Sequence, residues 1–228
     1  MSDLSDRIRA RGHWLVVVRP ATFIERRIEK LTDLWLIAQR SQVRLRGWYF
    51  PQVVPNVDPS YGNDWVGQES QYDHYLGAWR FYRSGQFIDL SAFMEDWRDE
   101  STLWPAPPGW QPGRELMVGG VLFRFTEIFE FAARLALSAA GDTRIRIEST
   151  LRGLSGRMLV GSHPWEYWLD GSRRTAEPEL TFQSELDREE LVAAPRELAL
   201  NSAIAFFQSF GWDADPDLLR EKQKTLRR

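Results

Sequence analysis

Hydrophobic and polar positions alternate with a period of two in several short segments of the chain. Residues 13–20, HWLVVVRP, form a β-branched run that a proline ends, which predicts a strand. Residues 43–50, VRLRGWYF, also alternate and predict a second strand. One side of that strand would carry Val43, Leu45, Gly47 and Tyr49, which suit a core, and the other Arg44, Arg46, Trp48 and Phe50.

A helical period lies between these two segments. Thr22 can cap a helix with Glu25 three positions later, and apolar residues recur at helical spacing as far as about Arg40. The opening of the chain is therefore predicted to be strand, helix, strand. Residues 51–72 contain three prolines and two glycines and show no clear period. We expect them to form a long loop that is functional or is ordered by a partner.

The middle of the chain predicts a hairpin followed by a break. Residues 74–93 contain two strand-like segments around Ser84-Gly85, a two-residue connection that tolerates a positive φ. A short helix is expected from Met94 to Asp99. Residues 103–113, LWPAPPGWQPG, contain four prolines and two glycines and are the best candidate for a boundary.

The second half repeats the order of a helix followed by strands. The predicted elements are a helix from about Leu116 to Ala139, a hairpin formed by 143–153 and 156–161, a strand at 178–186 and a helix from Arg196 to Phe210. Runs of strands with few strand–helix–strand crossovers favour an α+β fold with an antiparallel or mixed sheet and packed helices.

Two domain organisations are consistent with this order of elements. We expect one domain over residues 1–228. The alternative is a pair of similar lobes, 13–102 and 114–212, joined by the proline-rich segment and followed by a charged tail at 213–228.

Composition narrows the class of protein. A chain of 228 residues with 43% hydrophobic and 27% charged residues can bury a full core. The absence of cysteine excludes disulfides, thiolate metal sites and a cysteine nucleophile. The N-terminal residues lack the apolar region of a secretory signal, and the longest apolar runs are too short to span a membrane. We therefore expect a soluble, cytoplasmic protein without a membrane partner.

Charge is distributed unevenly, although the net charge is only −3. The first fifty residues contain ten basic and five acidic side chains, and the following 63 residues are acidic. A basic segment attracts phosphates or acidic partners, and the first fifty residues include the arginine-bearing segment 43–50.

Motifs that would announce a reaction are missing from the sequence. There is no phosphate-binding glycine loop and no nucleophile elbow, and His13, His74 and His163 are too far apart for a metal-ligand motif. Glu127 and Glu130 could face a metal from one helix, but Arg124 and Arg134 share their stripe. That pattern is typical of a solvated face with ion pairs. We expect no catalytic residues and no cofactor.

An acidic loop supports an alternative function. The residues concerned are Asp64, Glu69, Asp73 and His74. Clusters of carboxylates with a histidine can bind a divalent metal or perform general acid–base chemistry. This alternative is a metal-dependent hydrolase or nuclease, whereas the simpler interpretation is an acidic loop without a ligand.

Arginines beside aromatic rings provide a different candidate site. In the hairpin, Arg80 and Tyr82 share one face, and Trp79, Phe81 and Arg83 share the other. The candidate contact residues are Arg44, Arg46, Trp48, Arg80 and Arg83. If the hairpin pairs with segment 43–50, arginines and rings form one patch that suits single-stranded nucleic acid. The alternative is that the arginines only cover exposed rings through cation–π contacts.

Several strings of residues resemble one known family. They are Val43–Trp48 with Phe50-Pro51, Trp79–Tyr82, Ser84–Phe87, Thr126–Leu135, Leu151–Leu154 and Gly156-Arg157. Together they resemble the region C-terminal to the Schlafen-like (AlbA-type) domain of bacterial DNA-binding proteins. The resemblance covers most of the chain from His13 onward, without the Schlafen-like domain itself.

The resemblance implies a bacterial, nucleic-acid-associated setting such as defence. It carries no catalytic residues over to this chain. Our leading hypothesis is a non-enzymatic binding or adaptor protein whose partner is nucleic acid or a nucleic-acid-processing protein. A structural subunit with a protein interface is the third hypothesis, because exposed aromatic rings also suit such interfaces.

Overall fold

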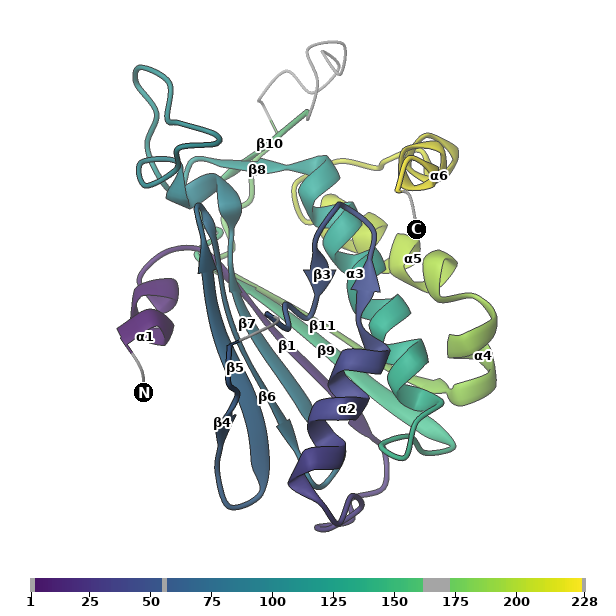
Figure 1. Cartoon of the computed structure of the whole chain (residues 1–228). Helices are drawn as coiled ribbons and strands as arrows, with labels where there is room; N and C mark the ends of the chain where they lie inside the picture. Colours follow the sequence, from purple (N-terminus) through teal and green to yellow (C-terminus); the bar gives the residue numbers. More distant parts are fainter. Residues whose placement is uncertain (1–2, 55–56, 162–172, 227–228) are drawn as a thin grey trace.

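A seven-stranded antiparallel sheet forms the centre of the computed structural model, which describes residues 3–54, 57–161 and 173–226 (Figure 1). In spatial order the strands are β11 (Glu179–Asp187), β9 (Arg144–Arg152), β1 (His13–Pro20), β7 (Phe87–Ala92), β6 (Tyr75–Tyr82), β5 (Trp65–Tyr72) and β4 (Ser60–Tyr61). Central β1 pairs with β7 on one side and with β9 on the other. Strands from both sides of the proline-rich segment therefore share one sheet, and the α+β prediction is confirmed.

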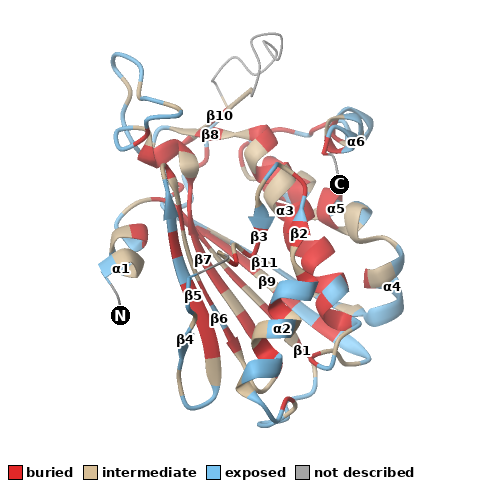
Figure 2. Ribbon diagram, viewed as in Figure 1, coloured by how far each residue is buried: buried red, intermediate tan, exposed pale blue. Residues whose placement is uncertain are grey.

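Helix α3 (Val118–Ala136) crosses one face of this sheet and provides the centre of the core (Figures 1 and 2). The Phe125 ring meets Trp14 of β1 edge-on with 5.2 Å between centroids, and Phe131 lies 4.6 Å from Phe87 of β7. Aromatic pairs at these distances add stability beyond the apolar area that they bury. Many of the aromatic side chains thus pack between α3 and the sheet.

Further helices accompany α3 and cover the sheet unevenly. Those on the α3 side are α2 (Leu31–Ser41), α4 (Arg188–Ala193), α5 (Pro195–Gln208) and α6 (Pro216–Lys224). On the other face the short α1 (Asp3–Arg9) buries Ile8 against Leu76 and Leu90 (Figure 1). Most of that second face has no helix over it among the described residues.

Five smaller elements complete the described part of the fold. The 3₁₀ helix η1 (Met94–Trp97) follows β7, as the expected short helix does. Strand β8 (Glu115–Met117) pairs in parallel with β10 (Met158–Val160). Strand β2 (Val43–Arg44) pairs with β3 (Tyr49–Phe50). The parallel pair corrects the prediction that residues 156–161 form a hairpin with 143–153.

The segment before α2 is not helical, contrary to its capping pattern. The Thr22 backbone N–H donates to the Asp142 carboxylate instead of starting a helix. Arg27 donates to the carbonyl oxygens of Gly141 and Thr22, and the Ile28 N–H donates to the Arg83 carbonyl. Contacts with distant loops therefore replace a helical turn, and α2 begins only at Leu31.

Residues 43–50 form a tight hairpin and not a strand of the main sheet. Gly47, with φ +91°, lies in the turn between β2 and β3. The turn reverses the alternation, so that Phe50 is buried and Tyr49 is exposed. The predicted loop 51–72 is also wrong in its second part, which forms β4 and the whole of β5. The sequence pattern did not predict β5, because it contains Gly67 and Ser70 and neither residue type favours strands strongly.

Other predictions were correct. The strand at 13–20, the hairpin around Ser84-Gly85 with Gly85 at φ +87°, the strand near 178–186 and the helix near 196–210 are confirmed. The long helix is confirmed with shorter bounds, because Leu116 belongs to β8. His163 lies outside the described residues.

A buried ion pair joins segments that are far apart in the chain. Asp96 of η1 and Arg157 are 2% and 1% exposed, and an Arg157 Nη1–H donates to Asp96 Oδ1 over 2.8 Å. The backbone N–H groups of Gly12 and Gly113 also donate to this carboxylate. Arg157 further donates to the carbonyl oxygens of Gly153 and Glu115. Gly12 precedes β1, Glu115 belongs to β8 and Gly153 follows β9, so the pair cross-links these segments with η1.

We expect Arg157→Ala to lower the free energy of unfolding by about 3–5 kcal/mol, because it leaves the Asp96 carboxylate buried without its counter-charge. Urea denaturation monitored by tryptophan fluorescence measures this change. The matched control is Arg152→Ala, which removes an exposed ion pair with Glu179 and should cost only about 0–1 kcal/mol. Equal losses in the two variants would contradict the structural role of Arg157.

Candidate ligand-binding cleft

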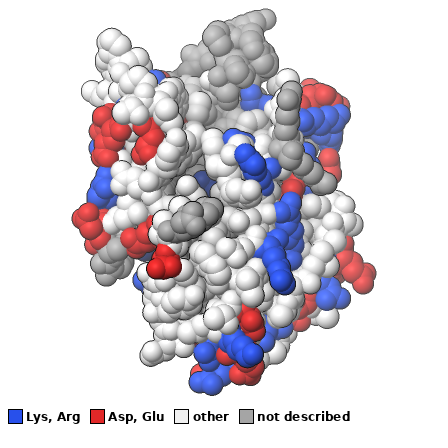
Figure 3. Space-filling model, in the orientation of Figure 1, with Lys and Arg blue, Asp and Glu red and all other residues white. Residues whose placement is uncertain are grey.

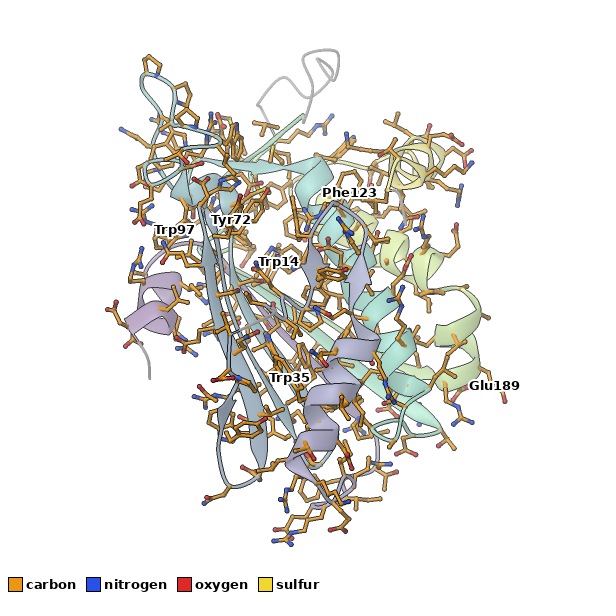
Figure 4. All side chains as sticks on the ribbon, in the orientation of Figure 1. Trp14, Trp35, Tyr72, Trp97, Phe123 and Glu189 are labelled. Carbon is orange, nitrogen blue, oxygen red and sulfur yellow. The ribbon has the colours of Figure 1, made fainter. Side chains whose placement is uncertain are left out.

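An open cleft of about 640 Å³ lies between one end of the sheet and the N-terminal part of α3. Its aromatic side chains come from separate elements and are Trp48, Tyr72, His74, Tyr75, Trp104 and Phe123. Figure 4 shows Tyr72 on the sheet side and Phe123 on the helix side. Tyr72 and the lining residue Leu103 are 62% and 64% exposed. Large rings thus surround a space that is open to a partner.

A smaller pocket of about 190 Å³ adjoins the cleft and shares Trp48, Tyr72 and Tyr75 with it. This pocket adds Asp89 from β7 and Arg124 from α3 to the lining. Figure 3 shows that much of the centre of the corresponding face is uncharged. Asp89 is 4% exposed and the Arg124 side chain is 16% exposed, so the charged groups of the pocket are largely removed from the surface.

Arg46 and Glu127 form the principal ion pair of the site. Arg46 Nε and Nη2 donate to the two Glu127 carboxylate oxygens over 2.8 and 2.7 Å. Burial alone would lower the pKa of Arg46, but the attraction of Glu127 outweighs it and raises the pKa. Arg124 Nη1 lies 3.5 Å from the same carboxylate, and burial lowers the pKa of Arg124. One carboxylate thus serves two arginines.

The solvated face that was predicted for α3 is wrong. Glu127 is 0% exposed and Glu130 is 5% exposed, and Glu130 accepts a hydrogen bond from Arg196 Nε over 2.7 Å. Buried carboxylates need such partners because an unpaired charge in the interior is strongly unfavourable. The spacing on α3 correctly suggested ion pairs, but most of the pairing is with other segments.

Buried acids near the cleft have perturbed proton affinities. Burial raises the pKa of Asp89, whose carboxylate accepts a hydrogen bond from Ser91 Oγ over 2.9 Å. Burial likewise raises the pKa of Glu95, which accepts the Met117 backbone N–H, and raises the pKa of Tyr75 to about 12. Such clusters of perturbed groups are common where proteins bind ligands.

A second polar cluster holds one wall of the cleft in place. Asp73, in the β5–β6 turn at φ +52°, accepts hydrogen bonds from the Thr102 N–H and Oγ1 and from Ser101 Oγ. Burial would raise the pKa of Asp73, but hydrogen bonds from Ser101, Thr102 and His74 outweigh it and keep the pKa well below its usual range. This carboxylate fixes the backbone that carries Leu103 and Trp104.

Ser101, His74 and Asp73 do not have the geometry of a hydrolytic triad. In such a triad the histidine presents Nδ1 to the carboxylate and Nε2 to the serine hydroxyl. Here Nδ1 lies 2.5 Å from Asp73 Oδ2 and 2.9 Å from Ser101 Oγ. The hydroxyl donates to Asp73 and accepts the Trp104 N–H, so it is not held for attack on a substrate.

The predicted contact residues do not form one patch. Arg44 lies over the exposed Tyr49 ring, and Arg46 lies over Trp48 at the cleft. Arg80 stacks over Trp65 on the opposite face of the sheet, because its neighbours Trp79 and Phe81 are buried on the α3 side. Arg83 lies in the β6–β7 turn, where its backbone binds residues 28 and 64. Of the five residues, Arg46 and Trp48 line the cleft.

The four residues of the metal-binding alternative do not converge on one site, although Asp73 and His74 are in contact. Asp64 and Asp73 flank β5 at its two ends, and the strand between them separates them by roughly 30 Å. Glu69 lines a groove on the α1 side, whereas His74 lines the cleft. Within the described ranges, histidine, aspartate and glutamate side chains form no group of three or more that could hold a metal.

A second groove, of about 370 Å³, lies on the α1 side of the sheet. Its lining includes Leu15, Trp65, Ile88 and Arg80, with Arg9 of α1. The buried, perturbed acids described above do not line it. We therefore place the candidate site in the aromatic cleft.

Sequence reasoning missed most of this cleft. Tyr72, Tyr75, Trp104 and Phe123 belong to segments that the pattern assigned to a loop, a hairpin, a linker and a helix. Their aromatic character was the available signal, but periodicity does not reveal which rings converge.

The fold and the site define an α+β protein with a ligand-sized aromatic cleft. The sequence matches no protein-family model, and comparisons with curated proteins and with solved structures gave no significant match. The resemblance to the region beside Schlafen-like domains stays a prediction. None of the described helices is both long and apolar enough to cross a membrane.

Arg44 and Arg46 provide a matched test of the site. We expect Arg46→Ala to lower the free energy of unfolding by about 3–5 kcal/mol, because it removes the main partner of the fully buried Glu127. Arg44→Ala should change stability by less than about 0.5 kcal/mol, since the Arg44 side chain is exposed. Urea denaturation measures the free energy of unfolding of both variants. Equal losses would contradict the role of the Arg46–Glu127 pair.

The raised pKa of Asp89 predicts a pH dependence. The folded protein binds this proton more tightly than the unfolded chain, so the Asp89 contribution to stability declines as pH rises above the unfolded pKa of about 3.9. The loss of melting temperature caused by Asp89→Asn should therefore be largest near pH 4 and smaller at neutral pH. Thermal melts of both proteins across this range measure it. A loss that is constant or grows with pH would contradict the prediction.

Proposed function

We propose that this chain is a non-enzymatic binding protein whose cleft holds an unstacked heterocyclic base, either free or within a single-stranded nucleic acid. The observation that carries the proposal is the convergence of Trp48, Tyr72, Trp104 and Phe123 on one open space of about 640 Å³. Ligand pockets commonly have volumes of roughly 300–1,000 Å³. Aromatic side chains on a platform or cleft are a common means of holding unstacked bases.

Polar groups beneath the rings suit the edge of a base. Arg124 can donate hydrogen bonds, and the Asp89 carboxyl can accept them when ionised or donate when protonated. Tyr75 lines both the cleft and the adjoining pocket and carries a hydroxyl. A planar ring between aromatic walls would therefore meet donors and acceptors at one edge, which is the combination that base recognition needs.

Phosphate recognition contributes little to this proposal. The Arg46 guanidinium is neutralised by Glu127, and Arg80 lies on the opposite face. Binding should therefore weaken only modestly with salt, because few phosphate charges are neutralised. The sequence predicted a patch of arginines that would contact phosphates, whereas the cleft would bind through its aromatic rings. Nucleic acid remains the proposed class of partner. The bacterial setting and the cytoplasmic location also stay predictions.

Binding is favoured over catalysis by the arrangement of the polar groups. Ser101 and His74 are engaged with Asp73 in supporting the wall of the cleft. The acids with raised pKa are held by neighbouring groups: Asp89 lies near Arg124 and accepts the Ser91 hydroxyl, and Glu95 accepts the Met117 backbone N–H. Ser91 is itself buried.

Trp48 is the residue to change first. We expect Trp48→Ala to weaken binding of a labelled single-stranded oligonucleotide by about 1–3 kcal/mol, which is the usual loss for one base–ring stack. Fluorescence anisotropy at low salt measures this, and thermal melts confirm that the variant is folded. Trp65→Ala is the matched control, since Trp65 is a partly exposed tryptophan on the opposite face.

Three further ligands test in which kind of molecule the cleft recognises a base. Titration with free nucleoside monophosphates, followed by calorimetry, tests whether an isolated base is sufficient. Single-stranded RNA and duplex DNA of the same sequence test the backbone and the need for unstacking. The proposal is wrong if none of these nucleotides and nucleic acids binds at low salt, or if Trp48→Ala and Trp65→Ala change the binding affinity equally. A protein partner then becomes the next candidate.

A further inference from the structure

The two edges of the main sheet differ in how they are protected. At one edge β4 is only two residues long, and the Gln68 and Ser70 side chains of β5 hydrogen-bond Val54 and Gln52 beside it. At the other edge β11 runs for nine residues, and β9 is its only partner strand in the described parts of the chain (Figure 1). Natural proteins usually shorten, cover or distort an edge strand, because its free backbone groups can pair with another chain.

Hydrogen bonds at the two ends of β11 identify which backbone groups face outward. The Arg188 N–H donates to the Thr143 carbonyl, and the Leu154 N–H donates to the Pro178 carbonyl. In an antiparallel pair both backbone groups of alternate residues point to the same side. The even-numbered residues of β11 therefore bind β9, and residues 179, 181, 183 and 185 direct their N–H and C=O groups away from the sheet. No described residue hydrogen-bonds these groups. Asp187, at the end of the strand, is the N-cap of α4.

Side chains on this edge form rows of opposite charge. Arg144, Arg146 and Arg152 of β9 are paired with acidic residues of β11. The acidic row on β11 consists of Glu179, Glu185 and Asp187. On the core side, Leu180, Phe182 and Leu186 are only half-buried. These acids bind arginines on the β9 side but stay exposed, with Glu185, Glu179 and Asp187 at 29%, 43% and 73%, so a further cation can approach them from the open side. The edge thus offers a free backbone, an exposed acidic row on one face and apolar side chains on the other.

We infer that β11 is a docking edge for an extended polypeptide segment that is basic on one face and apolar on the other. Such a segment would add an eighth strand and place its basic side chains beside the acidic row. A second copy of this chain fits less well, because two-fold antiparallel pairing centred on Gln183 would place Glu179 opposite the Asp187 of the other copy. The site is separate from the aromatic cleft and does not depend on its function.

A synthetic strand provides the probe. In an antiparallel arrangement, the labelled peptide Arg-Val-Arg-Val-Thr-Val-Thr-Val-Arg would place arginine opposite residues 187, 185 and 179. We expect it to bind the full chain in fluorescence anisotropy. The same peptide with glutamate in place of arginine should bind at least about tenfold more weakly, because like charges across strands are unfavourable.

Gln183→Pro tests the backbone contribution. Proline removes an outward N–H but no hydrogen bond to β9, and proline is tolerated on edge strands in this position. We expect at least about tenfold weaker peptide binding. Gln183→Thr keeps the N–H and should bind as the parent chain does. A thermal melt without peptide establishes that Gln183→Pro is folded, and hydrogen exchange should show new protection at Thr181, Gln183 and Glu185 when the parent chain binds peptide.

The outcomes separate the alternatives. Loss of binding in Gln183→Pro with protection at the odd-numbered amides would support strand addition. Failure of the basic peptide to bind, equal binding of the acidic peptide, or binding that is unchanged in a folded Gln183→Pro would overturn the inference. If the parent chain forms a dimer and Gln183→Pro dissociates it, a second copy of the chain occupies the edge. That result would overturn the inference that a basic segment docks on β11.

Discussion

The buried pair of Asp96 and Arg157 is the interaction on which the arrangement of this fold depends. It receives backbone hydrogen bonds from Gly12 just before β1 and from Gly113 just before β8, and it reaches Gly153 just after β9. A side chain at Gly12 would collide with this pair, since an added Cβ would lie 2.1 Å from the Arg157 guanidinium. An ion pair removed from water is favourable only with such complete hydrogen bonding.

The aromatic cleft follows from the position of that pair. Asp96 holds the end of the proline-rich segment, and the adjacent Glu95 accepts the Met117 N–H where β8 leads into α3. These contacts bring Met117 and Phe123 opposite the sheet, while Asp73 holds Trp104 at the other side. Structural acids thus position the rings of the cleft, and Arg46 with Glu127 supports them from within the site.

Local pattern was informative where one segment contained its own signal. Alternation identified β1, Ser84-Gly85 identified the β6–β7 hairpin, and the apolar runs identified α3 and α5. It failed where distant groups competed with local ones. Thr22 has the residue pattern of a helix cap, but its N–H binds Asp142, and residues 43–50 alternate but turn at Gly47 to pack against α3.

The sequence by itself determined the class of fold, because strand and helix periods depend on neighbouring residues and on one buried face. Only the tertiary structure decided the site. Glu127 and Glu130 have the spacing of a solvated stripe, yet their partners Arg46 and Arg196 lie 81 and 66 positions away. Whether a charge is buried, and which opposite charge it meets, depends on how layers pack, and packing brings together residues whose separation in the chain carries no periodic signal.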